Sequence, residues 1–236
     1  MTEELFRLDS YLSSCDALVV SADSTGIELD RTVFYATGGG QPGDQGILRL
    51  KDGGEVVVSG CQKDRESGQH VHIPTEGAAL PAVGERVIAE IDWARRHKLM
   101  RMHSCLHLLC AIVDGGVTGG QVGEEKSRLD FDLEDTSLDK EVLTDRLNRL
   151  IIDNHVVKIS STSDAELAAN PELVRTMSVQ PPTGAGKVRL ISIGSVDLQP
   201  CGGTHVRATG EIGPVRVGKI ENKGKHNRRI NVHLET

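Results

Sequence analysis

The chain has 236 residues, of which 38% are hydrophobic and 3% aromatic, and its net charge is −7, values that suit a globular protein of one or two domains. No apolar run reaches the roughly 18–20 residues that cross a bilayer, and the sequence shows neither a secretory signal nor a cysteine-rich framework. These features exclude a membrane-spanning or disulfide-stapled protein and predict a cytoplasmic one with reduced thiols and no membrane partner.

Short runs of β-branched residues, separated by turn signals, occupy the first part of the chain. They predict strands at 17–21, 26–29, 46–50, 55–59, 70–73 and 85–91. Strands of this length and spacing are typical of a small antiparallel barrel or sandwich. We therefore predict an all-β domain over residues 1–92.

The pattern changes at Asp92, which can cap a helix over residues 93–113, a stretch without Gly or Pro. A Gly-rich break over residues 115–120 is expected after this helix. Beyond it, the pattern predicts a strand at 126–132, a helix at 138–155 and strands at 156–160, 188–193, 213–220 and 229–234. Residues 93–236 are thus predicted to form an α+β domain, with helices packed on an antiparallel sheet.

Two histidines, His103 and His107, lie four residues apart in the first predicted helix. At this spacing they share a helix face and can offer both imidazoles to one metal ion. Leu99 and Cys110 lie on the same face, which indicates that the pair points into the protein. A pair of hydrogen-bonded core histidines is the alternative interpretation. Serine at position 104, where HExxH metalloproteases carry a catalytic glutamate, disfavours a peptidase.

A second candidate element is Cys201-Gly-Gly-Thr-His205. Its two glycines allow a tight loop to bring a thiolate and an imidazole together, and these ligands suit zinc. A turn with an incidental Cys and His is the alternative. Combined with His103 and His107, the loop predicts a tetrahedral Zn²⁺ site in which water or substrate can displace one ligand. Thr204 lies between the expected ligands and could hydrogen-bond that water or the substrate, although the residue alone favours a plain turn position.

Three consecutive glycines, Gly38, Gly39 and Gly40, precede Gln41 in a segment spanning residues 32–46. Glycines permit positive φ or a close approach of backbone to another surface. The segment lacks the GxxxxGK[ST] order of a phosphate loop. An ordinary hairpin loop is the alternative to a functional motif.

Basic side chains are concentrated in the second part of the chain, where residues 93–236 carry 20 basic and 18 acidic groups against 7 and 16 in residues 1–92. Cations at a helix N-terminus oppose its dipole, so an anionic partner would explain the basic cluster at the start of the first predicted helix. Most charge runs, however, are simply solvated. The scarcity of aromatic rings favours phosphate and sugar contacts with a structured RNA over base stacking. The predicted RNA contacts are Arg95, Arg96, Lys98, Arg101, Lys223, Lys225 and Arg228.

Together these motifs resemble the AlaX-type alanyl-tRNA editing proteins, which are related to the editing domain of alanyl-tRNA synthetase and the second additional domain of threonyl- and alanyl-tRNA synthetases. The resemblance rests on HSCLH at 103–107, QPCGGTHV at 199–206 and FYATGGGQPGDQG at 34–46, and covers nearly the whole chain. By length the chain resembles the medium-sized class. The resemblance implies an N-terminal translation-factor-like β-barrel over residues 1–92 and a zinc-binding α+β editing domain over residues 93–236.

The resemblance also implies an activity, the hydrolysis of the ester that links serine or glycine to tRNA(Ala). Zinc would be held by His103, His107 and Cys201, with His205 as the fourth ligand or a close neighbour. The metal would either lower the pKa of the attacking water or orient the substrate, and no carboxylate is an obvious general base.

The glycine motif, residues 38–40 with Gln41, would face the editing pocket in such a protein. Thr32 would recognise a serine hydroxyl, and Gln121 would lie near the pocket as a polar residue. Two other functions stay open: a tRNA-binding module with a structural zinc, and a zinc hydrolase of small esters. The sequence predicts no oligomeric state.

Overall fold

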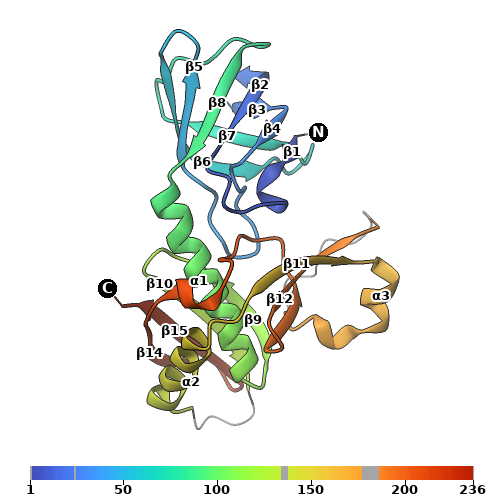
Figure 1. Cartoon of the computed structure of the whole chain (residues 1–236), viewed down its shortest axis with the longest axis vertical. Helices are drawn as coiled ribbons and strands as arrows, with labels where there is room; N and C mark the ends of the chain where they lie inside the picture. The colour runs from blue at the N-terminus through green and yellow to red at the C-terminus, as the bar shows by residue number, and fades with distance from the viewer. Residues whose placement is uncertain (1, 24, 134–137, 177–185, 236) are drawn as a thin grey trace. The chain divides into compact units, whose positions relative to one another are not determined.

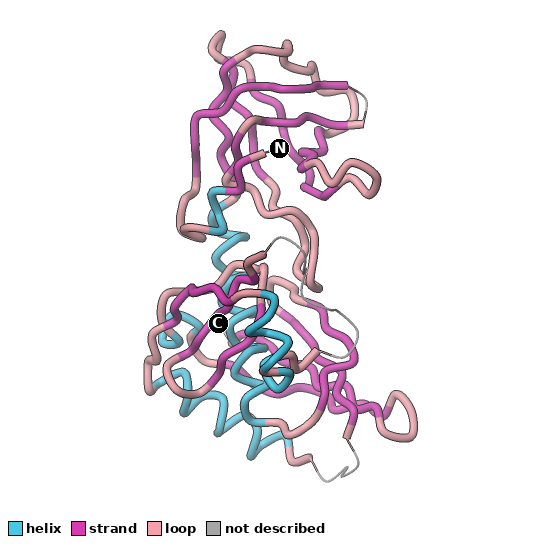
Figure 2. Tube along the Cα trace, turned by 90° about the vertical axis from the view of Figure 1, so that its right-hand side faces the viewer, coloured by secondary structure: helices cyan, strands magenta, loops and turns pink. Residues whose placement is uncertain are grey.

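The computed structural model describes residues 2–23, 25–133, 138–176 and 186–235. The chain is mixed α and β and divides into two compact units, Met1–His97 and Lys98–Thr236 (Figure 1). Strands and loops make up most of the first unit. The described α-helices belong to the second unit, apart from the first residues of helix α1 (Trp93–Ile112) (Figure 2). Within the described ranges, no helix is long and apolar enough to span a membrane.

The first unit is a closed antiparallel barrel with strand order β2-β3-β7-β6-β5-β8. All six predicted strands are confirmed, with ends that differ by a few residues. Their bounds are β2 (Ser14–Asp23), β3 (Gly26–Leu29), β5 (Gly46–Leu50), β6 (Glu55–Lys63), β7 (His70–Pro74) and β8 (Arg86–Ile91). The two-residue strands β1 (Glu3–Glu4) and β4 (Arg31–Thr32) pair in parallel outside the barrel, and a 3₁₀ turn, η1 (Leu5–Arg7), follows β1. Strands this short have no alternating pattern, and the sequence did not predict them.

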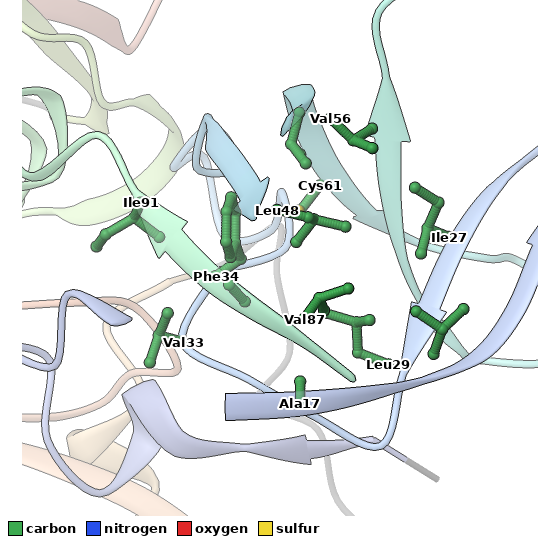
Figure 3. Close-up of a cluster of buried hydrophobic side chains, with 13 residues drawn as sticks. Ala17, Ile27, Leu29, Val33, Phe34, Leu48, Val56, Cys61, Val87 and Ile91 are labelled. Carbon is green, nitrogen blue, oxygen red and sulfur yellow. The ribbon is translucent and has the colours of Figure 1, made fainter. Parts of the chain in front are cut away.

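Every second side chain along the barrel strands points inward and helps to fill the barrel interior. Val56 and Val58 of β6 are 1% exposed, whereas Val57 between them is 47% exposed, because successive side chains point to opposite faces of a strand. Closure of the barrel leaves none of its six strands with a free edge. The buried cluster, shown in Figure 3, comprises Ala17, Val19, Ile27, Leu29, Val33, Phe34, Leu48, Val56, Val58, Cys61, Val87, Ala89 and Ile91.

The glycine segment forms a tight turn in the loop before β5. The backbone N–H groups of Gly38 and Gln41 each donate to the other residue's carbonyl, at 3.1 and 2.9 Å. Gly39 and Gly40 between them have φ of +56° and +80°, values that residues with a Cβ atom rarely adopt. The glycines therefore serve the backbone geometry in the way that the sequence analysis anticipated.

The α-helices were predicted more accurately where they are long. Helix α1 (Trp93–Ile112) begins where expected, and the backbone N–H of Arg95 donates to Asp92 Oδ1 at 3.0 Å. Helix α2 (Lys140–Ile152) is shorter than predicted at both ends and is capped by Asp139. Helix α3 (Asp164–Ala169) was missed, since six residues are too few for a periodic pattern. The described part of the second unit also contains two 3₁₀ turns, η2 (Pro171–Leu173) and η3 (Thr209–Ile212).

Two antiparallel sheets accompany these helices. One has the order β14-β15-β10-β9 and the other β11-β12-β13. The bounds are β9 (Gly116–Gln121), β10 (Lys126–Asp132), β11 (Val157–Thr162), β12 (Val188–Ile193), β13 (Asp197–Pro200), β14 (Val215–Asn222) and β15 (Asn227–Leu234). Helix α2 contacts β14 and buries its Leu143, Leu147 and Ile151. The α+β character predicted for this part of the chain is therefore present.

Helix α1 ends before the Gly-rich segment 115–120, as predicted, but the strand β9 that forms within this segment was missed. Gly120 pairs with Leu129 of β10, and a Cβ on Gly120 would lie 2.8 Å from Leu129 Cδ2. Glycine has a low strand propensity, but pairing with a neighbouring strand overrides it here. The short strand β13 was also missed.

Candidate metal centre

The four side chains expected to bind metal converge in the second unit. One ligand atom from each of His103, His107, Cys201 and His205 lies within 4.8 Å of each of the others. Cys201 Sγ is 3.6 Å from His103 Nε2 and 3.3 Å from His205 Nε2. A tetrahedron with bonds of about 2.0–2.3 Å separates its ligand atoms by about 3.5 Å. The cluster is therefore positioned to hold a metal ion.

Two elements supply these ligands. Residues 102–110 of α1 are all buried, so the i, i+4 spacing directs His103 and His107 into the interior. Cys201 and His205 lie in the loop that follows β13. That loop is held by Arg189 of β12, whose Nη1 donates to the carbonyl oxygens of Cys201 at 2.7 Å and Gly203 at 2.9 Å.

A carboxylate orients one of the histidines. Asp197 Oδ2 lies 2.8 Å from His107 Nδ1, and Gln199 Nε2 donates to Asp197 Oδ1 at 2.7 Å. A carboxylate beside Nδ1 places the hydrogen on that nitrogen and leaves the Nε2 lone pair for a metal. Sequence reasoning missed Asp197 and Gln199. Their placement four and two residues before Cys201, at every second position, was the signal that could have found them.

A hydroxyl orients the loop histidine. Ser104 Oγ lies 3.1 Å from His205 Nδ1 and accepts a hydrogen bond from the backbone N–H of Val206 at 3.2 Å. Ser104 is fully buried and occupies the position between the two helical histidines at which the sequence analysis noted the absence of glutamate. It therefore links α1 to the Cys201–His205 loop.

The electrostatics of the cluster favour the thiolate form of Cys201. Burial raises the pKa of the Cys201 thiol, but the nearby His103 and His205 outweigh it and hold that pKa well below its ordinary value. Burial lowers the pKa of His107, but Asp197 and Cys201 outweigh it and raise it to about 10. A thiolate with three imidazoles, backed by a carboxylate, is a donor set that fits zinc.

Removing the charge of Asp197 is expected to weaken metal binding. An Asp197→Asn chain should bind Zn²⁺ about 10- to 100-fold less tightly, because His107 Nδ1 loses its anionic partner. Competition with a chromophoric chelator measures the affinity. Asp153→Asn, the same change at an exposed residue after α2, is the matched control and should leave the affinity unchanged. Equal affinities for both variants would contradict the role given to Asp197.

Comparison with known proteins assigns this chain to a family. Residues 188–231 match the model of the threonyl and alanyl tRNA synthetase second additional domain, and residues 11–95 match that of class II (A) tRNA synthetases. The chain is 37% identical to the alanyl-tRNA editing protein AlaX-M of Methanosarcina acetivorans, in an alignment that covers 98% of each. The chain belongs to the AlaX family of alanyl-tRNA editing proteins.

Two further AlaX relatives match over the same span. The AlaX-M protein of Methanosarcina mazei is 36% identical, over 98% of this chain and 95% of that protein. The AlaX-M protein of Saccharolobus solfataricus is 34% identical, over 98% of each. Both alignments run nearly end to end.

The other residues that the AlaX resemblance indicated differ in burial and in the unit to which they belong. Thr204 is fully buried in the ligand loop beside His205, whereas Gln121 is exposed at the end of β9. Thr32 and the glycine motif with Gln41 belong to the first unit. Thr32 Oγ1 accepts the backbone N–H of Phe34 at 3.1 Å and lies 2.8 Å from His72 Nε2. Recognition of a serine hydroxyl by Thr32 stays a prediction, and it requires this hydroxyl to exchange its bond with His72.

Two of the predicted RNA contacts are corrected by the structure. Arg96 is completely buried and paired with Asp44, and Arg228 is 9% exposed with its Nη1 bound to Asn222 Oδ1 and the carbonyl of Gly224. Charge runs in sequence do not reveal such internal partners, and both guanidinium groups are structural. The remaining candidates are at least partly exposed: Arg95, Lys98, Arg101, Lys223 and Lys225.

Proposed function

We propose that this chain hydrolyses the ester bond of tRNA(Ala) mischarged with serine or glycine, at a site containing Zn²⁺. The observation that carries the proposal is the buried cluster of His103, His107, Cys201 and His205 in a chain aligned end to end with AlaX editing proteins. In the reaction, water adds to the ester carbonyl carbon and the bond to the ribose oxygen breaks. The amino acid and a tRNA with a free hydroxyl are released in the cytoplasm.

Zinc, when bound, supplies Lewis acidity that polarises a carbonyl or activates water. The chain's own residues hold and orient it: Asp197 retains the Nδ1 hydrogen of His107, and Ser104 lies against Nδ1 of His205. Both carboxylate oxygens of Asp197 are hydrogen-bonded, one to His107 and the other to Gln199, so Asp197 does not serve as the general base. Thr204, buried beside the ligands, is the hydroxyl that we assign to the substrate or the attacking water.

Binding of tRNA is assigned to the exposed and partly exposed basic residues. Lys223 and Lys225 lie exposed in the β14–β15 connection, and Arg95, Lys98 and Arg101 lie along α1. Each lysine or arginine that neutralises a phosphate adds to the salt dependence of binding. We further assign the barrel of the first unit to the translation-factor type. Gln121 is retained as a polar residue near the editing pocket.

Deacylation of seryl-, glycyl- and alanyl-tRNA(Ala) by the zinc-loaded chain tests this proposal, with a chelator-treated sample beside it. We expect chelator-sensitive loss of the seryl or glycyl ester while the alanyl ester is spared. For serine, a site that hydrogen-bonds the side-chain hydroxyl discriminates against alanine by several kcal/mol. Absence of deacylation by a folded, zinc-bearing chain would indicate a binding module. Equal hydrolysis of free aminoacyl esters would indicate a small-ester hydrolase.

A further inference from the structure

A second group of potential metal ligands lies inside the barrel, in the first unit. One ligand atom from each of Cys61, His70 and His72 lies within 4.8 Å of the others, and all three side chains are buried. Cys61 of β6 is paired in register with His72 of β7, and His70 precedes His72 by two residues on the same strand face. Cys61 belongs to the core cluster drawn in Figure 3. The strand pairing therefore brings the three side chains together.

His70 presents a ring nitrogen that no described residue satisfies. Its Nε2 is buried and has no hydrogen-bond partner within the described ranges. Leaving a buried polar atom unpaired costs about 1–3 kcal/mol, so such an atom in a folded protein calls for a physical explanation. A metal ion at the centre of the cluster would provide its missing partner.

A carboxylate sets the tautomer that exposes this lone pair. His70 Nδ1 lies 3.3 Å from Glu4 Oε1. Glu4 is also ion-paired with Arg7 and with Lys63 Nζ at 3.0 Å, and these cations favour its ionised form. An ionised carboxylate only accepts hydrogen bonds, so Nδ1 carries the hydrogen and Nε2 the lone pair. This is the same arrangement as that of Asp197 and His107 in the second unit, and it is characteristic of metal-binding histidines.

His72 is oriented in the same sense. Its Nδ1 lies 3.0 Å from the carbonyl oxygen of Ile27, which only accepts, so Nδ1 carries the hydrogen. Its Nε2 therefore has a lone pair, which accepts the hydroxyl hydrogen of Thr32 at 2.8 Å. Thr32 Oγ1 also accepts the N–H of Phe34. Because Thr32 Oγ1 lies 2.8 Å from His72 Nε2, the Thr32 side chain must turn about χ1 before an ion can occupy the lone pair of Nε2.

We propose that Cys61, His70 and His72 form a second metal site, within the barrel, for a cation of the Zn²⁺ class. A thiolate and two neutral imidazoles are ligands that such cations prefer. Binding replaces the thiol hydrogen of Cys61, which leaves as a proton, and the hydrogen bond from Thr32 to His72. The ion would join β6 to β7 and stabilise the folded barrel by mass action.

Cobalt spectroscopy on the full chain distinguishes the two sites, because each contains one cysteine. In a Cys201→Ala chain, added Co²⁺ is expected to give thiolate-to-cobalt charge-transfer absorption that arises from Cys61. The additional change Cys61→Ala should abolish this absorption. Cys105→Ala in place of Cys61→Ala is the matched control, since Cys105 is fully buried but belongs to neither cluster, and it should leave the absorption intact. Absence of the absorption in the folded Cys201→Ala chain would overturn the proposal.

Metal stoichiometry of the unmodified chain gives a second, independent test. Elemental analysis after dialysis against Zn²⁺ should give two equivalents, falling to one in a His70→Gln chain. His155→Gln is the control, because His155 Nε2 is also buried without a partner among the described residues but belongs to neither cluster; it should retain two equivalents. Saturation of the unmodified chain at one equivalent would overturn the proposal, whether or not the variants fold.

Discussion

Replacing Cys201 with alanine is expected to abolish zinc binding and deacylation while leaving the chain folded. The thiolate is the one anionic ligand among the four, and its Sγ lies within 3.6 Å of both His103 Nε2 and His205 Nε2. Its loss removes the charge that balances the cation. Because Lewis acidity supplies several kcal/mol of transition-state stabilisation, the deacylation rate should fall by about a thousandfold or more.

The fold should survive this change because Cys201 lies in the loop after β13, outside the barrel core and the four-stranded sheet. Circular dichroism checks the fold, and deacylation of seryl-tRNA(Ala) checks the activity. Cys105→Ala is the matched control, because it removes a fully buried thiol from α1 without touching the cluster. That variant should lose packing energy and keep its zinc. An unfolded Cys201→Ala chain would indicate a structural metal, and an active one would exclude Cys201 from the site.

Replacing Asp44 with asparagine is expected to lower the free energy of unfolding by about 3–5 kcal/mol, since it leaves a buried charge uncompensated. Arg96 is completely buried, and its Nε donates to both carboxylate oxygens of Asp44 at 3.0 Å. The other guanidinium nitrogens donate to the carbonyls of Ser10 at 2.9 Å and Val33 at 2.7 Å. Asp44 also accepts the backbone N–H of Tyr35. This single ion pair therefore ties the start of α1 to two loops of the first unit, the one that contains Ser10 and the one between β4 and β5.

Urea unfolding followed by circular dichroism measures this effect. Asp16→Asn, the same change at an exposed position of β2, should alter the stability by no more than about 0.5 kcal/mol. Replacing both Asp44 and Arg96 with leucine should restore part of the loss, because no unpaired charge then remains buried. A loss below about 1 kcal/mol in the Asp44→Asn chain would contradict the role assigned to the pair.

Much of the architecture could be predicted from local sequence patterns. The six barrel strands follow from short runs of β-branched residues between turn signals, and α1 and α2 follow from long helical patterns, the first of them with Asp92 as its capping residue. The spacing of His103 and His107 indicated a shared helix face, and the CGGTH loop indicated a second pair of ligands. These features depend on residues close together in the chain, so local geometry determines them.

The structure was needed wherever a residue's role depends on a distant partner. Gly119 and Gly120 lie in a strand because β10 pairs with them, and Arg96 is internal because Asp44, 52 residues earlier, meets it. Asp197 supports His107 across 90 residues, and Glu4 contacts His70 across 66. The sequence by itself determined the types of the longer elements and the residues of the candidate metal centre, because both follow from short-range spacing. Only the tertiary structure decided which charges are buried and which carboxylates orient the histidines, because those contacts arise when distant segments pack together.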